Sequence, residues 1–317
     1  MKYLITGGAG FIGSHLSAKL LEHGHSIDII DNFDPYYNRE VKEKNIKNIL
    51  ANEHVNLFEI DIQQSAEINT YCGSSQYDGI IHLAAKAGVR PSIINPIEYQ
   101  NVNVGGTQNL LEFAREKKIQ QFIYGSSSSV YGINPNTPWS EADNVLLPIS
   151  PYASSKVSGE LLGHVYSQLF GVRFVALRFF TVYGPRQRPD LAIHKFAKRI
   201  LNHESIPVYG DGTTSRDYTY VDDIVNGIIS AIGYTDSMYE VFNLGNSQPL
   251  SLSKLISNIE TAIGHKAIID RQPMQAGDVN TTFADISKAQ KLLDYSPQTK
   301  MQQGLAKFVD WLKENER

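Results

Sequence analysis

Short apolar runs alternate with helix-like segments through the first half of the chain. The apolar runs predict buried strands at Tyr3–Ile5, Ser26–Ile30, Val55–Ile60, Ile80–Leu83 and Phe122–Tyr124. The segments between them predict helices at Ile12–Glu22, Val41–Leu50, Ala66–Tyr71 and Val104–Lys117. Because strand and helix alternate regularly, we expect an α/β fold with a doubly wound parallel sheet and right-handed crossovers.

The pattern changes after about residue 178. Proline and glycine interrupt the chain at 183–185 and 209–212, and aromatic, basic and polar residues become interleaved. The expected elements of this half are a strand at Val241–Leu244 that returns to the sheet, a helix at Leu252–Ile263, a strand near Ala267–Asp270 and a helix at Met301–Asn315. We therefore predict a main domain and a smaller, discontinuous C-terminal lobe at the carboxyl edge of the sheet, where ligands of such folds bind. The main domain comprises residues 1–178 with 219–249 returning to it, and the lobe comprises 179–218 and 250–317.

The bulk composition excludes several classes of protein. With 42% hydrophobic and 20% charged residues, neither a disordered nor a fibrous chain is expected. A net charge of −4 gives no indication of nucleic-acid or membrane binding, and no apolar run approaches the roughly 20 residues of a membrane span. The single cysteine, Cys72, suits a reducing compartment, so we expect a cytoplasmic protein. The nine histidines lack metal-ligand spacing, and we predict no metal site.

A glycine-rich turn follows the first predicted strand and opens the first helix. Gly7, Gly10 and Gly13 have the spacing of a dinucleotide-binding loop, in which absent side chains let a pyrophosphate approach a helix N-terminus. Asp31, at the end of the second strand, can accept hydrogen bonds from the adenosine ribose and repel a 2′-phosphate, which favours NAD over NADP. The dipeptide Asp61-Ile62 can reach the adenine ring, although a simple turn explains it equally well.

A tyrosine and a lysine stand four residues apart at the start of a predicted helix. Tyr152 and Lys156 share one helix face, where the ammonium can stabilise a phenolate and lower the pKa of the tyrosine. The polar run 126–129 follows the fifth strand and lies at the carboxyl end of that strand. A hydroxyl of that run can share a substrate proton with Tyr152. These residues together favour hydride chemistry at a hydroxyl-bearing carbon.

Over essentially its whole length the sequence resembles the extended short-chain dehydrogenase/reductase family, the NAD-dependent sugar-nucleotide epimerases and dehydratases. The matching landmarks occur in the family's order: Thr6–Gly13, Asp31-Asn32, Leu83-Ala84-Ala85, Ser126–Gly132, Ser150-Pro151-Tyr152, Lys156 and Arg178–Pro185. The resemblance implies a Rossmann-type, NAD-binding main domain and a nucleotide-sugar-binding lobe. It makes Ser127, Tyr152 and Lys156 the catalytic residues. It adds further cofactor contacts at Phe11, Ile12, Asn32, Leu83, Ala84, Ala85, Lys86 and Phe179.

The residues before Val130-Tyr131-Gly132 bear on the reaction. Dehydratases of this family carry Asp-Glu there and UDP-glucuronate decarboxylases carry Ser-Glu, whereas this chain has Ser128-Ser129. Elimination of water needs an acid and a base beyond the tyrosine, so the serines disfavour dehydration and, less strongly, decarboxylation. We expect 4-epimerisation through a transient 4-keto sugar that Ser127, Ser128 and Ser129 contact. NAD is then regenerated in each turnover and stays tightly bound.

The segment 181–196 bears on the sugar. It differs from the Asn-Pro-containing segment of UDP-galactose 4-epimerases and is similar to that of UDP-glucuronate 4-epimerases. Arg186 and Arg188 supply cationic forks for a phosphate or a carboxylate. We assign Arg188 to the carboxylate of a uronate, with Thr181 and Ser128 as hydroxyl partners. The resemblance implies contacts to the rest of UDP at Val208, Tyr209, Arg216 and Asp278.

The segment 86–90 is also similar to UDP-glucuronate 4-epimerases, but many relatives carry Arg-Tyr where this chain has Arg90-Pro91. Other functions stay open: a UDP-glucose/UDP-galactose 4-epimerase, a UDP-glucuronate decarboxylase and, more remotely, an NAD-binding sensor without catalysis. Sensors usually lose the catalytic tyrosine or lysine, and both are present here. The resemblance finally implies a homodimer formed by the helices around Val104–Lys117 and Tyr152–Phe170, with a UDP-sugar as the other partner.

Overall fold

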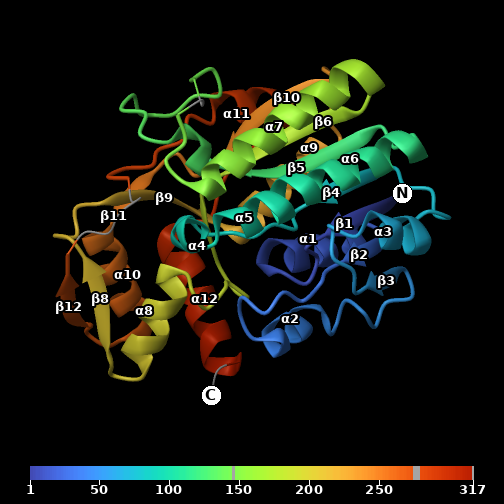
Figure 1. Cartoon of the computed structure of the whole chain (residues 1–317). Coiled ribbons are helices and arrows are strands. Elements are labelled where there is room, and N and C mark those ends of the chain that lie inside the picture. The colour runs from blue at the N-terminus through green and yellow to red at the C-terminus, as the bar shows by residue number, and fades with distance from the viewer. Residues whose placement is uncertain (145–146, 274–278, 316–317) are drawn as a thin grey trace.

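A seven-stranded parallel sheet forms the centre of the molecule (Figure 1). The computed structural model describes residues 1–144, 147–273 and 279–315. In the order β3-β2-β1-β4-β5-β6-β10, the strands are β3 (Val55–Phe58), β2 (Ser26–Ile30), β1 (Lys2–Thr6), β4 (Gly79–His82), β5 (Gln121–Ser127), β6 (Arg173–Phe179) and β10 (Tyr239–Leu244). All neighbouring strands are parallel. The order reverses between β1 and β4, as in dinucleotide-binding folds, so the predicted doubly wound α/β fold is confirmed.

The strands are apolar because helices cover both faces of the sheet. Every residue of β4 and β5 is buried. The five strands predicted for the first half are present, with small differences in their limits, and β6 is an additional strand that the pattern did not reveal. The predicted strand at Val241–Leu244 is the second part of β10, and it pairs with β6. The predicted return to the sheet at Val241–Leu244 is therefore confirmed.

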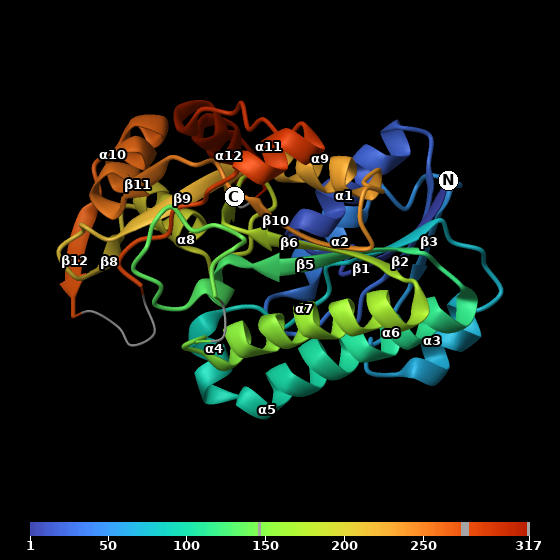
Figure 2. The same ribbon diagram turned by 90° about the horizontal axis from the view of Figure 1, so that it is seen from above.

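Two helical layers enclose the sheet (Figure 2). One layer contains α3 (Ser65–Cys72), α4 (Val89–Ile94), α5 (Pro96–Tyr99), the π-helical turn η1 (Gln100–Gly105), α6 (Gly106–Lys117) and α7 (Pro151–Phe170). The other contains α1 (Phe11–Glu22), α2 (Arg39–Ile46), α9 (Val221–Ile232) and α11 (Ser287–Leu293). Helix α7 lies very close to the sheet at Gly163. A Cβ on this residue would stand 2.2 Å from the ring of Phe174. Gly159 lies equally close to β5, since a Cβ there would stand 2.2 Å from the hydroxyl of Tyr124.

A smaller group of elements adjoins the sheet (Figure 1). Its strands are β7 (Thr181–Tyr183), β8 (Ser205–Tyr209), β9 (Ser215–Tyr220), β11 (Pro249–Ser251) and β12 (Ile268–Gln272). They pair as the small sheets β11-β9-β7 and β12-β8. The accompanying helices are α8 (Ala192–Leu201), α10 (Leu252–Ile263) and α12 (Met301–Asn315). This group corresponds to the expected lobe, although the domain limits drawn from the sequence stay a prediction.

The carboxyl ends of the central strands lie in register. Thr6 at the end of β1 pairs with Ile30 and His82, and Ser127 at the end of β5 pairs with Phe179. Several loops therefore leave the sheet at one edge, and Figure 2 shows the smaller lobe beside that edge. The short 3-10 helix η2 (Ser128–Tyr131) begins there, directly after β5. This is the crevice in which open α/β sheets bind ligands.

Candidate active site

A cavity of about 510 Å³ lies at the carboxyl edge of the sheet, between the glycine loop and the smaller lobe. Most of the residues predicted for the site line it. From the cofactor set these are Gly7, Gly10, Phe11, Ile12, Gly13, Asp31, Asn32, Ile62, Leu83, Ala84, Ala85, Lys86 and Phe179. From the catalytic and sugar-binding sets they are Ser127, Ser128, Ser129, Tyr152, Lys156, Thr181 and Arg188.

The glycine loop is packed too tightly to accept side chains. A Cβ on Gly7 would lie 2.7 Å from the backbone nitrogen of Ala84, and Gly7 also has a φ of +73°. A Cβ on Gly13 would lie 2.2 Å from the carbonyl oxygen of Gly7. Gly10 is the N-cap of α1 and supplies no side-chain hydrogen bond to the first turn. The helix N-terminus beside the cavity is therefore open to an anionic ligand.

Asp31 lies at the end of β2 with its carboxylate in the cavity wall. One carboxylate oxygen accepts the N–H of Ala9 at 3.0 Å and the other accepts that of Phe33 at 2.9 Å. Burial raises the pKa of this carboxyl group, and the charge of Lys42 and the two hydrogen bonds oppose the rise. Each oxygen keeps a further lone pair, so Asp31 can also accept hydroxyl groups of a ribose.

His82 holds the neighbouring strand end in place. Its Nδ1 lies 2.7 Å from the Thr6 hydroxyl and its Nε2 lies 2.9 Å from the Thr107 hydroxyl. The Thr107 hydroxyl donates its proton to the carbonyl of Asn103, at 2.5 Å, so it accepts from His82. His82 is therefore the neutral Nε2–H tautomer. Burial, followed by the charge of Lys156, lowers the pKa of His82 to about 3.

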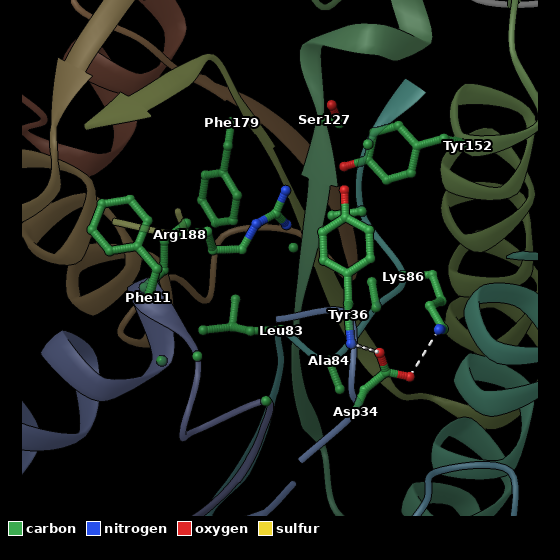
Figure 3. Close-up of a pocket in the computed structure, with 18 of the residues that line it drawn as sticks. Phe11, Asp34, Tyr36, Leu83, Ala84, Lys86, Ser127, Tyr152, Phe179 and Arg188 are labelled. Atoms are coloured by element: carbon green, nitrogen blue, oxygen red, sulfur yellow. Dashed lines mark hydrogen bonds and ion pairs between the residues drawn. The ribbon is translucent and has the colours of Figure 1, made fainter. Parts of the chain in front are cut away.

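The predicted catalytic pair, Tyr152 and Lys156, stands in the first two turns of α7. Ser150 caps this helix by accepting the N–H of Ala153 at 3.1 Å, and Pro151 follows as the first helical residue. The ammonium of Lys156 donates to the carbonyl oxygen of Gly125 at 2.6 Å, which ties the helix to the end of β5. The hydroxyl of Ser127 lies close enough to that of Tyr152 to act against the rise in the pKa of the tyrosine. Figure 3 shows their hydroxyl groups on the same side of the cavity.

The pKa of Tyr152 corrects one expectation. Burial raises this pKa above its ordinary value, and the hydrogen bond with Ser127 and the charge of Arg188 only oppose the rise. In the protein without ligands, the cost of desolvating the phenolate therefore exceeds the stabilisation by Lys156 that was expected to lower the pKa of Tyr152. Burial also lowers the pKa of Lys156 to about 7, against the opposing charge of Glu160. A positive charge brought by a ligand would favour the tyrosinate.

Asn103 in η1 is a residue that the sequence did not reveal. Its amide binds both backbone groups of Lys86, accepting from N–H at 2.8 Å and donating to C=O at 2.9 Å. The same amide donates to the hydroxyl of Ser155 at 2.9 Å, and Ser155 donates to the carbonyl of Tyr152 at 2.7 Å. Asn103 thus connects the loop after β4 with the first turn of α7. No local spacing indicates this role, because it depends on the π-helical turn.

Arg188 enters the cavity from the opposite side. Its guanidinium binds Asp190 through Nε at 3.0 Å and Nη2 at 2.9 Å, and its side chain is 19% exposed. Figure 3 shows it pointing from the lobe toward the space beside Tyr36 and Tyr152. Tyr36, which also lines the cavity, is a second residue missed from the sequence. It lies in the loop after β2, far along the chain from Arg188.

Other predicted residues lie outside the lining of this cavity. Asp61 instead accepts a hydrogen bond from the amide of Asn32 at 2.9 Å. Arg186 has a φ of +62° and lies near His15, where burial and the Arg186 charge lower the histidine pKa to about 4. Arg216 donates to the carbonyl of Ser215 at 2.8 Å. Val208 and Tyr209 in β8 also lie outside this lining, and Asp278 is outside the described residues.

Arg90 and Pro91 form part of α4 at the margin of the site. The guanidinium carbon of Arg90 lies 5.0 Å from the ring centroid of Tyr209. Pro91 packs against Gly88, where a Cβ would lie 3.2 Å from the proline ring. Gly88 has a φ of +109°, so the loop bends sharply before the helix. Arg90 thus joins α4 to β8, the strand that holds the predicted UDP contacts Val208 and Tyr209.

Two general features concern the described ranges as a whole. No helix in residues 1–144, 147–273 and 279–315 combines the length and apolar character needed to cross a membrane. Within the same ranges, no three or more histidine, cysteine or acidic side chains gather into a group that could hold a metal ion. Cys72 is buried and unpaired.

Known proteins are similar to this chain over nearly its full length. The model of the NAD dependent epimerase/dehydratase family matches residues 3–245. UDP-glucuronate 4-epimerase of Thermodesulfobacterium geofontis is 38% identical, over 99% of this chain and 96% of that protein. The crystal structure of UDP-glucuronic acid 4-epimerase from Bacillus cereus, with UDP-glucuronic acid and NAD, is 38% identical with a TM-score of 0.92 over 99% of each chain. UDP-glucose 4-epimerase of Thermotoga maritima, with UDP-glucose, is 30% identical with a TM-score of 0.91 over 100% of each chain.

Proposed function

This chain belongs to the NAD dependent epimerase/dehydratase family, and we propose that it converts UDP-glucuronate to UDP-galacturonate at C4, with NAD as cofactor. The observation that carries the proposal is the position of Arg188. A guanidinium enters the same cavity as Tyr152 and Ser127, in a chain similar to two UDP-glucuronate 4-epimerases. A uronate is the sugar whose carboxylate gains most from that cation.

The cavity fits NAD on three observations. Gly7 and Gly13 leave a cradle that a Cβ would fill, and the first turn of α1 is open to a pyrophosphate. The Asp31 carboxylate stands where adenosine ribose hydroxyls would bind, and its charge disfavours a 2′-phosphate. Lys156, at the other end of the cavity, is the residue we assign to the nicotinamide ribose. Bound NAD would supply the acceptor for the C4 hydride and return that hydride to the opposite face.

The protein's own part in the reaction is proton transfer and orientation. Tyr152, as phenolate, removes the proton of the 4-hydroxyl group while the C4–H bond breaks, and the sugar becomes a 4-keto intermediate. Ser127, whose hydroxyl lies on the same side of the cavity as that of Tyr152, holds the same oxygen. After the keto sugar has turned in the cavity, Tyr152 returns the proton to the 4-oxygen. The tyrosinate, which burial disfavours, would gain from the positive charges of Lys156 and of the oxidised nicotinamide.

The acidic residues of the cavity support epimerisation over dehydration. Among the described lining residues, the carboxylates are those of Asp31 and Asp34, and both follow β2. The positions after Ser127 carry the serines 128 and 129. Dehydration needs an acid and a base beside the reacting carbons, and neither carboxylate belongs to the segment that carries them in dehydratases. The similarity to a UDP-glucose 4-epimerase makes UDP-glucose the second substrate to test.

The product of UDP-glucuronate identifies the function. Purified protein is incubated with UDP-glucuronate and NAD, and the sugar nucleotides are resolved by NMR. We expect UDP-galacturonate to form until an equilibrium mixture is reached. A UDP-pentose as the main product would indicate decarboxylation, and conversion of UDP-glucose alone would identify the second candidate. Bound NAD without turnover of any UDP-sugar would indicate a sensor.

We further propose a homodimer that assembles through α6 and α7. Leu161, Val165 and Leu169 are spaced four residues apart on α7 and are 57%, 44% and 68% exposed. Such an apolar stripe on a surface helix is typical of a face that a second helix pair covers. Light scattering after gel filtration should give twice the chain mass, and Leu161→Glu should reduce it to one chain.

The single buried cysteine supports a cytoplasmic location.

A further inference from the structure

One edge of the Arg188 guanidinium is already bound by the protein. Asp190 accepts from Nε at 3.0 Å and from Nη2 at 2.9 Å, which is the side-on arrangement of a fork and a carboxylate. Within the described part of the chain, Nη1 makes no hydrogen bond to another residue. The guanidinium lines the cavity, so the Nη1 edge remains for a ligand. A substrate carboxylate and Asp190 can therefore bind opposite edges of the same cation.

Tyr36 supports this arrangement from the cofactor side. Its hydroxyl donates to Asp190 Oδ2 at 3.3 Å, and its ring centroid lies 5.4 Å from the guanidinium carbon of Arg188. A guanidinium near an aromatic face is attracted by the ring quadrupole. Tyr36 belongs to the same loop as Asp31, so a segment that begins at the ribose site reaches the sugar-binding arginine.

Tyr36 is itself fixed in place. Its backbone N–H donates to Asp34 Oδ1 at 2.9 Å, and Asp34 Oδ2 lies 2.8 Å from the ammonium of Lys86. Glu98 binds the same ammonium at 2.7 Å. Figure 3 shows the contacts that join Tyr36, Asp34 and Lys86. Although Tyr36 is 38% exposed, Asp34 thus holds its backbone, while Asp190 and Arg188 contact its hydroxyl and its ring.

We propose that Asp190 and Tyr36 are positioning residues that hold Arg188 with its Nη1 edge toward the cavity and thereby set the preference for a uronate over a neutral sugar. The inference rests on the proposed function, because the uronate carboxylate is the group that this edge would bind. The two residues contribute to selectivity through orientation: a planar guanidinium forms two parallel hydrogen bonds with a carboxylate only when its edge faces that carboxylate. A neutral sugar has no carboxylate and depends little on that orientation.

The test measures selectivity in variants that keep the size of each side chain. Asp190→Asn removes the charge, and Tyr36→Phe removes the hydroxyl and keeps the ring. We expect the ratio of kcat/KM for UDP-glucuronate to that for UDP-glucose to fall about tenfold in Asp190→Asn and about threefold in Tyr36→Phe. The loss should lie mainly in KM for UDP-glucuronate. Asp310→Asn, at an exposed carboxylate of α12, is the control for a general change of charge.

A double-mutant cycle tests whether Asp190 acts through Arg188. In an Arg188→Lys background, Asp190→Asn should change the ratio by less than about twofold, because an ammonium has no planar edge to orient. An equal fall in both backgrounds overturns the inference, since Asp190 then acts independently. Tyr36→Phe removes one hydroxyl group from a partly exposed side chain, so its effect on the ratio remains measurable if Asp190→Asn fails to fold.

The outcomes separate this inference from the proposed function. Wild-type protein that does not epimerise UDP-glucuronate overturns both. Wild-type protein that epimerises it, together with variants at 36 and 190 that keep the wild-type ratio, overturns only the positioning role. A merely structural role for Asp190 predicts equal losses on the two substrates and a lower melting temperature. Selective loss on UDP-glucuronate, with unchanged melting temperature, supports the inference.

Discussion

Backbone atoms form most of the cofactor side of the cavity, whereas side chains form most of its sugar side. The cofactor side consists of close-packed backbone, where glycines 7 and 13 leave no room for a Cβ. The sugar side depends on charged side chains, such as the pair of Arg188 and Asp190, with Tyr36 reaching it from a distant segment. A substitution of these glycines would displace backbone atoms. A substitution on the sugar side exchanges one side chain for another, and the fold tolerates that exchange.

This difference teaches where selectivity can vary on a common fold. NAD presents the same pyrophosphate and ribose to every member of such a family, so a rigid backbone cradle serves all of them. The sugar differs among members, and exchangeable side chains on loops can follow it. Variants that remove one component at a time, beginning with the residue between the two sides, should therefore separate the contributions of the two sides.

Tyr152→Phe should give the largest loss of activity while leaving both sides intact. The variant keeps the ring and removes the hydroxyl that moves the 4-hydroxyl proton, so kcat should fall by about 10²–10⁴-fold. NAD content and melting temperature should stay at wild-type values. The measurement is the initial rate of UDP-galacturonate formation by NMR. A variant that keeps more than about a tenth of the wild-type rate would show that another group transfers the proton.

Arg188→Ala should damage the sugar side alone. Loss of a charged hydrogen bond should lower kcat/KM for UDP-glucuronate by roughly 10- to 100-fold. Without the Arg188 cation to hold its carboxylate, the 4-keto uronate should also lose CO₂. In this reaction the C5–C6 bond breaks, its electron pair forms the C4–C5 enolate, and C5 takes up a proton. The product is a UDP-4-ketopentose, which becomes a UDP-pentose once hydride returns to C4, and NMR product analysis should detect these species.

Arg186→Ala is the matched comparison for that variant, two residues away and outside the cavity lining. Its kinetics with UDP-glucuronate should stay within about twofold of wild type. Equal losses at 186 and 188 would contradict the different directions in which the structure places the two side chains.

Gly13→Ala should damage the cofactor side. The added Cβ would meet the carbonyl oxygen of Gly7 at 2.2 Å and the Cα of Gly8 at 2.8 Å, both of them backbone atoms. We expect a loss of about 1–3 kcal/mol in the free energy of unfolding, with reduced NAD content in the purified protein. Urea unfolding and absorbance of released cofactor measure the two effects. Gly105→Ala is the control, because a Cβ there has nothing within 4 Å.

His82 gives the cofactor side a pH dependence of stability. The folded state lowers the pKa of this histidine to about 3, below its ordinary value of 6.5. Between these values the unfolded chain binds a proton that the folded protein does not. Stability should therefore fall as the pH falls from about 6.5 to about 3, by up to about 1.4 kcal/mol per pH unit from this residue.

His82→Gln should flatten this acid limb in urea unfolding between pH 7 and pH 4. His54→Gln, at an exposed histidine, is the control and should leave the slope unchanged. The same slope in wild type and His82→Gln would mean that other groups cause the acid sensitivity.

The part of the site that the sequence predicted depends on short spacings. Gly7 to Gly13, and Tyr152 to Lys156, lie within one loop or one helix face, so the local pattern determines their geometry. Asp31 was predictable because it ends a strand next to the glycine loop. The fold class followed from the regular alternation of strands and helices.

The part that the sequence did not predict depends on contacts between distant segments. Tyr36 and Asp190 are 154 positions apart and meet only in the folded chain. The different directions of Arg186 and Arg188 depend on the φ of +62° at Arg186, a left-handed conformation that the sequence pattern does not indicate. The hydrogen bond from Asn32 to the carboxylate of Asp61 likewise joins two segments far apart in the sequence, and the contact of Asp61 with the adenine stays a prediction.

The π-helical turn η1 has a consequence for how this protein can evolve. A π turn contains one residue more than the corresponding α-helical turn. This extra residue rotates the preceding part of the helix relative to α6. Asn103 depends on that extra residue to reach both Lys86 and Ser155. Deleting one residue from 100–105 would restore regular helix and turn Asn103 away from these partners. Substitutions on the outer surface of η1 should therefore persist among descendants of this chain, whereas changes in its length should be eliminated.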